Sequence, residues 1–110
     1  MNEKTAAERI AQILDEKKAE NIQVIHVGDK TIIADYFVVC SGRSTPHVKA
    51  LCDEVEEKNK QGDPGLTRLR TDGYRDGRWI IIDFGTVLVH IFHPEEREYY
   101  KMERLWASGD

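Results

Sequence analysis

Long apolar runs, paired cysteines and a secretion leader are all missing from the sequence. Apolar stretches such as residues 79–82 and 87–89 fall far short of the roughly 18 to 20 residues that cross a bilayer, so we expect no membrane span. Cys40 and Cys52 are the only cysteines and form no CxxC pair, which predicts reduced, buried thiols. Residues 1–13 mix charges with alanines, lack the apolar core of a secretory signal and are too acidic for a transit peptide. These absences predict a cytoplasmic protein.

The chain also lacks a surplus of positive charge. Its 110 residues carry 16 basic and 20 acidic side chains, for a formal net charge of -4. Because attraction to phosphate backbones needs a surplus of Lys and Arg, we predict no strong direct nucleic-acid binding. The one basic stretch, residues 66–78, is more simply explained as a solvated surface. The length suits one domain, and we expect residues 1–110 to form it.

Motifs for phosphate, metal and catalytic chemistry are absent as well. Neither GxxxxGK[ST] nor GxGxxG occurs. The loop at residues 41–44 precedes a helix and could hold a phosphate, but Pro46 removes one amide donor, and a capped tight turn explains the loop better. His90 and His93 would point to opposite faces of a strand, so we predict no metal site. No spacing selects an acid, base or nucleophile, so we predict no catalytic residue and no cofactor.

Apolar periodicity, helix caps and turn residues predict an α/β fold. The expected helices cover residues 3–20, residues 46–60 and a C-terminal stretch from Pro94 that carries Tyr99, Tyr100, Met102, Leu105 and Trp106. The expected strands cover residues 22–27, 31–40, 67–71, 78–83 and 86–92, the first of them buried on both faces. This order predicts a single mixed sheet of about five strands with flanking helices.

Four blocks of sequence, in a fixed order over residues 6–106, carry a family resemblance. They are Asp35-Tyr36-Phe37-Val38-Val39-Cys40-Ser41-Gly42, Trp79-Ile80-Ile81-Ile82-Asp83-Phe84-Gly85, Val89-His90-Ile91-Phe92, and Arg97 with Tyr99-Tyr100 and Glu103-Arg104-Leu105-Trp106. In these blocks the chain closely resembles the ribosomal silencing factor family, also called Iojap or RsfS.

The resemblance implies a nucleotidyltransferase-like shape without the enzymatic activity. It further implies binding to the large ribosomal subunit through that subunit's protein number fourteen, which blocks the small subunit and lowers translation when nutrients are short. A homodimer is also possible. The alternative is a nucleotide-binding or nucleotidyltransferase-like enzyme, whose chemistry needs a Gly-Ser turn and a carboxylate pair that holds metal. Here the order is Ser41-Gly42, and no Asp-x-Asp or Asp-x-Glu occurs.

Within the matching blocks we predict a partner-binding patch. Its residues are Trp79, Asp83, Phe84, Gly85 and His90. Trp79 and Asp83 would share one side of a strand, with Phe84 at the hairpin tip, and aromatic side chains commonly anchor protein interfaces. The equally weighted alternative is that Trp79 covers the sheet beneath a helix. For His90, burial is favoured over contact.

Overall fold

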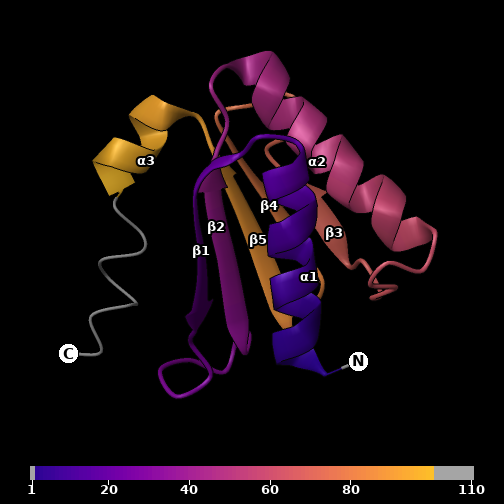
Figure 1. Ribbon diagram of the computed structural model, residues 1–110. Coiled ribbons are helices and arrows are strands. Elements are labelled where there is room, and N and C mark those ends of the chain that lie inside the picture. Colours follow the sequence, from indigo (N-terminus) through magenta and orange to yellow (C-terminus); the bar gives the residue numbers. More distant parts are fainter. Residues whose placement is uncertain (1, 101–110) are drawn as a thin grey trace.

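A computed structural model describes residues 2–100 and contains one five-stranded sheet with the strand order β1-β2-β5-β4-β3 (Figure 1). The helices in this part of the chain are α1 (Glu3–Glu16), α2 (Thr45–Lys60) and α3 (Pro94–Tyr100). The strands are β1 (Glu20–His26), β2 (Tyr36–Ser41), β3 (Arg70–Asp72), β4 (Trp79–Asp83) and β5 (Val87–Phe92). Met102, Leu105 and Trp106, expected in the last helix, lie outside the described residues.

The sheet is mixed, as predicted. The two central strands, β2 and β5, run parallel, whereas β1 pairs with β2, β4 with β5 and β3 with β4 in antiparallel fashion. The α/β class and the single sheet of five strands are therefore confirmed. The likeness to nucleotidyltransferases stays a prediction.

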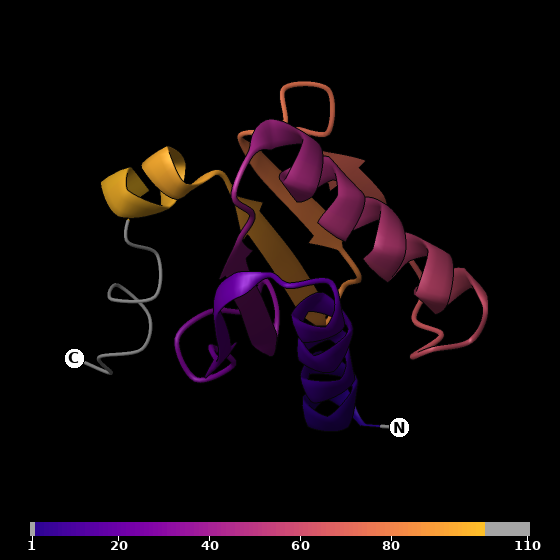
Figure 2. The ribbon, with the colours of Figure 1, turned by 45° about the horizontal axis from the view of Figure 1, so that its top comes forward.

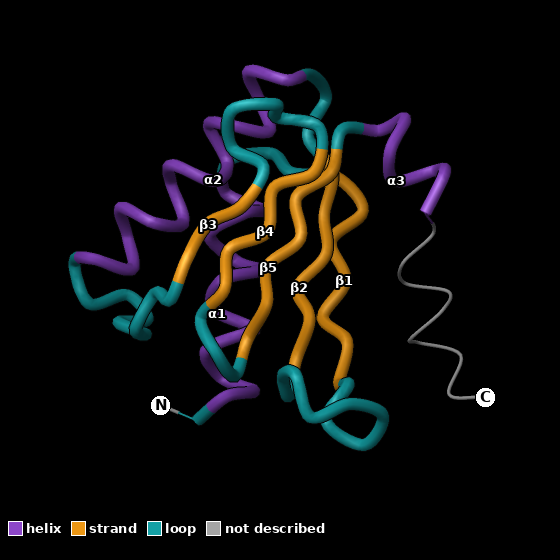
Figure 3. Tube along the Cα trace, turned by 180° about the vertical axis from the view of Figure 1, so that it is seen from behind, coloured by secondary structure: helices purple, strands orange, loops and turns teal. Residues whose placement is uncertain are grey.

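The sheet has two different faces. Helices α1 and α2 cover one of them (Figures 1 and 2), where Ile10 and Leu51 pack against Val38 and Ile82 in the larger core cluster. Figure 3 shows the other face, with α1 and α2 behind the sheet. A smaller apolar cluster lies there, and Trp79 and Ile81 are packed against it. No helix in the described part of the chain is long and apolar enough to cross a membrane.

Both long helices begin with side-chain caps, and α1 ends earlier than predicted. Asn2 accepts a hydrogen bond from Thr5 N before α1, and Ser44 accepts one from His47 N before α2. The prediction of a helix to residue 20 is wrong because Lys18 has a φ of 66°. A left-handed residue ends the right-handed spiral, and β1 begins at Glu20.

The N-terminal half of the sheet differs from the prediction in two places. Residues 31–35 are not strand but loop, and β2 starts only at Tyr36, where pairing with β5 begins. The apolar, β-branched pair Ile32 and Ile33 suggested a strand, yet both side chains are exposed. Strand β1 is not buried on both faces, because it is an edge strand with mostly exposed residues.

The two cysteines behave as the sequence predicts. Cys40 and Cys52 are free and buried. Burial raises the pKa of each thiol to about 12. Neither side chain is therefore a thiolate near neutral pH, which is the reactive form of cysteine.

Candidate protein-binding face

Strand β4 places alternate side chains on the face that α1 and α2 leave open. Ile80 and Ile82 are fully buried on the helix side, whereas Trp79, Ile81 and Asp83 are half-buried on the other side. The strand alternation therefore puts Trp79 and Asp83 on one side, as predicted. Trp79 is not covered by α1 or α2, since it packs against the smaller cluster on the opposite face.

Two neighbours on β5 hold the indole ring of Trp79. Trp79 lies opposite Phe92 in the strand register, and the two rings stack with centroids 4.9 Å apart and planes at 25°. The indole Nε1 donates a hydrogen bond to Nδ1 of His90, over 3.1 Å. A half-buried aromatic side chain is thus fixed in one orientation by a stacked ring and a polar contact.

His90 supports this face from beneath. It is only 5% exposed, and its ring centroid lies 4.7 Å from that of Phe37. Burial lowers the pKa of His90 to about 4, so the ring is neutral at pH 7. Because Nδ1 accepts the bond from Trp79, we assign the proton to Nε2, which has no hydrogen-bond partner among the described residues. The structure gives His90 a positioning role, which fits the expectation of burial.

The β4–β5 hairpin separates the remaining predicted residues. Asp83 accepts a hydrogen bond from Gly85 N over 2.8 Å, and Gly85 has a φ of 81°, so these two residues form the turn. Phe84 is 5% exposed and belongs to the core cluster on the helix side. Its side chain does not join Trp79 and Asp83. Gly85 is half-buried and lies at the end of the face.

Sequence reasoning named Arg97 only as part of the family resemblance and gave no structural role to the two arginines that fix α3 beside this face. Arg78 precedes Trp79 and donates to Glu95 (2.8 Å) and Glu96 (2.9 Å) in the first turn of α3. This contact lowers the pKa of the Glu95 carboxyl. Arg97 is buried and donates to Ser41 Oγ over 3.0 Å and to the backbone carbonyl of Asn21 over 2.6 Å. The acidic first turn of α3 is visible in the sequence, whereas its pairing with Arg78 is not.

The loop before α2 is built as a turn, not as a phosphate cradle. Gly42 N donates to Phe92 O over 2.9 Å, and Arg43 N donates to His47 Nδ1 over 2.9 Å. His47 N is taken by the Ser44 cap. A Cβ on Gly42 would lie 2.9 Å from Val48, so the loop packs closely against the helix. Three amides that could meet a phosphate are already engaged.

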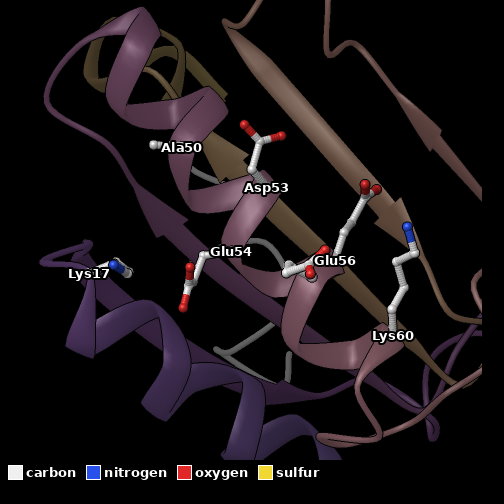
Figure 4. A pocket seen from close by; sticks show the side chains of 7 residues that line it. Lys17, Ala50, Asp53, Glu54, Glu56 and Lys60 are labelled. Carbon is white, nitrogen blue, oxygen red and sulfur yellow. The ribbon is translucent and has the colours of Figure 1, made fainter.

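A hollow of about 570 Å³ lies over α2 and the end of α1, on the opposite side of the molecule from Trp79. Its lining includes Lys17, Asp53, Glu54 and Lys60. Figure 4 shows the carboxylates of α2 spread along the helix rather than converging on one point. No group of three or more metal-binding side chains occurs among the residues the structure describes. None of the predicted partner-binding residues lines this hollow.

Comparisons with known proteins cover nearly the whole chain. The family described as "Ribosomal silencing factor during starvation" matches residues 1–110. A Bacillus subtilis (strain 168) protein named Ribosomal silencing factor RsfS is 36% identical over 109 residues, or 99% of this chain and 91% of that protein. Its namesake from Halalkalibacterium halodurans is 38% identical over 96 residues, or 87% and 80%. The crystal structure of a Chromobacterium violaceum protein matches with a TM-score of 0.90 at 29% identity, over 97% of this chain and 88% of the other.

Proposed function

Because this chain belongs to the ribosomal silencing factor family, we propose that it binds the large ribosomal subunit and prevents the small subunit from joining. Its contact on the large subunit is protein number fourteen, and its effect is to lower translation in the cytoplasm when nutrients are limiting. The mechanism is steric occlusion, with no bond made or broken. The observation that carries the contact is the oriented, half-buried Trp79 on a sheet face that α1 and α2 leave open.

The geometry of Trp79 suits an interface anchor. Tryptophan is enriched among the few residues that dominate binding energy. Its ring is already held by Phe92 and His90, so little side-chain freedom remains to be lost when a partner covers it. Beside it, the half-buried Ile81 adds apolar surface to the same face.

Charge favours a basic protein partner over RNA. The chain carries a formal charge of -4, and Asp83 and Asp72 lie on the Trp79 face of the sheet. Arg70, the cross-strand neighbour of Asp83, is paired with Asp72 over 3.1 Å. An acidic surface attracts the Lys and Arg side chains of a ribosomal protein and speeds encounter.

The enzymatic alternative has no supporting observation in the described residues. The amides of Gly42, Arg43 and His47 are engaged in the turn before α2. We propose that the protein is not an enzyme. Turnover of a nucleoside triphosphate that a single carboxylate substitution abolishes would overturn that statement.

A homodimer forms part of the proposal. Strand β1 pairs with β2 on one side only and is an edge of the sheet. Its sequence, Glu-Asn-Ile-Gln-Val-Ile-His, contains no proline or lysine, the residues that commonly protect an edge from pairing. Pairing of two β1 edges about a two-fold axis would join two sheets. Light scattering should then give twice the 12.7 kDa mass of the chain.

The test of the proposed function is a subunit-joining experiment. Purified small and large subunits are mixed with saturating protein, and the products are separated on a sucrose gradient. We expect the joined particle to decrease and the protein to travel with the large subunit. Trp79→Ala should restore joining, whereas Tyr74→Ala should not, because Tyr74 is a 40% exposed aromatic residue that lies against α2. Normal joining with saturating wild-type protein would refute the proposal.

A further inference from the structure

The most exposed large apolar side chains of the described residues gather at one end of the sheet. Ile32 is 103% exposed, Ile33 68% and Leu69 63%. We call these three residues the basal edge. The isoleucines lie in the β1–β2 loop and Leu69 lies just before β3, and Figure 3 shows these two connections at the same end of the sheet as the turn between β4 and β5.

The loop that carries the two isoleucines is well fixed. Val27 N donates to Asp35 O over 2.9 Å and closes the loop at its base. Asp35 N donates to Thr86 O over 2.8 Å and ties the loop to the β4–β5 turn. Within the loop, Ile33 N donates to Thr31 Oγ1 over 3.1 Å. The isoleucines are therefore presented on an anchored backbone.

Leu69 is joined to the same turn from the other side. Its backbone N donates to Asp83 O over 2.7 Å. A Cβ on Gly85 would lie 3.7 Å from Leu69 Cδ1. Three inter-strand steps separate β2 from β3, so these two strands lie roughly 14 Å apart at this end of the sheet. Because Asp83 and Gly85 also belong to the proposed partner-binding face, the two surfaces are continuous.

Exposed apolar groups that cluster in this way usually mark a contact surface, whereas single ones are ordinary. The charges nearby indicate the kind of partner. The isoleucine loop carries Asp29 and Lys30, which balance. Near Leu69, Arg68 lies 3.7 Å from Glu56. Without a surplus of positive charge, neither RNA nor an anionic lipid surface is favoured.

We propose that the basal edge is a second contact surface, at which Ile32 and Ile33 insert into an apolar pocket on a protein of the large ribosomal subunit. This inference rests on the proposed function and adds to the Trp79 face a distinct, purely apolar contact. Two adjacent isoleucines provide a compact hydrophobic anchor whose burial favours binding in proportion to the apolar area covered.

The test compares Ile32→Thr/Ile33→Thr with the control Tyr74→Ala. The two isoleucine changes keep β-branched side chains, and so the backbone preference, while adding a hydroxyl group. Tyr74 is 40% exposed and lies against α2, away from the basal edge. Affinity for purified large subunits is measured by co-sedimentation, folding by circular dichroism and thermal midpoint, and mass by light scattering.

We expect the double variant to bind large subunits at least about tenfold more weakly than wild type, with unchanged folding and mass and with Tyr74→Ala unaffected. Wild-type affinity in the double variant would overturn the basal contact and leave the proposed function standing. A fall in mass from dimer to monomer in the double variant would assign the edge to a second copy of the chain and overturn the inference. Failure of wild-type protein to bind large subunits would overturn both.

Discussion

The buried His90 should make the stability of this protein depend on pH in a defined direction. Its pKa is lowered from the ordinary value of 6.5 to about 4 in the folded chain. The unfolded chain therefore binds a proton more readily than the folded chain between these values. Stability is fully present above pH 6.5 and is lost as the pH falls towards 4.

The size of this effect follows from the two pKa values. They differ by about 2.5 pH units, which at about 1.36 kcal/mol per unit limits the loss to about 3 kcal/mol. At about pH 5 the folded ring is still mostly neutral and the unfolded ring mostly charged, so the loss is about 2 kcal/mol. That is a large part of the roughly 5 to 15 kcal/mol that stabilises a small domain.

The assay is urea unfolding of wild type and His90→Gln at about pH 5 and about pH 7.5. Glutamine does not titrate, and its amide oxygen can still accept the hydrogen bond from Trp79. Between the two pH values, wild type should lose about 2 kcal/mol more than the variant. The contributions of all other titrating groups cancel in this difference when they are independent of residue 90. Equal losses in the two proteins would refute the assignment of a buried, neutral His90.

Four further outcomes test the other parts of the structure. Trp79→Ala should weaken binding to isolated large-subunit protein number fourteen by about 2 kcal/mol, as expected for a hot spot, and Tyr74→Ala should leave it unchanged by calorimetry. His90→Leu should weaken the same binding about three- to tenfold, because the indole N–H loses its acceptor, whereas His90→Gln should bind as wild type. Gly73→Ala should lower the free energy of unfolding, measured in urea, more than Gly62→Ala does. Both glycines have a positive φ, but only a Cβ at Gly73 would meet the carbonyl oxygen of Trp79. The two buried cysteines, each with a pKa of about 12, should react with iodoacetamide only after unfolding, as mass spectrometry would show.

Much of the fold could be predicted because its signals are local. Ser44 and Pro46 mark the start of α2, and the structure places the cap and the first turn there. The alternation in β4 placed Trp79 and Asp83 on one side, since a strand has a side-chain period of two. These signals act between residues a few positions apart, so the sequence displays them directly.

Two of the errors have different physical causes. Ile32 and Ile33 have high strand propensity, but no strand of the described residues pairs with them, and the neighbouring β5 starts only at Val87. Phe84 was placed on the binding patch because it lies at a hairpin. The chain turns there, and its ring enters the core under the helices. Strand pairing decides the first case, whereas Phe84 continues the alternation that places Ile80 and Ile82 on the helix side.

The choice of histidine at residue 90 indicates whether this side chain serves packing or the orientation of Trp79 for a partner. A leucine would fill an apolar site without a polar atom, whereas a buried ring nitrogen without a hydrogen-bond partner costs about 1 to 3 kcal/mol. His90 carries such an atom, Nε2, among the described residues, and its other nitrogen accepts the Trp79 N–H. Packing alone does not explain that cost, but fixing the half-buried indole of Trp79 for a partner does. If the histidine served packing only, His90→Leu would stabilise the protein and leave partner affinity unchanged.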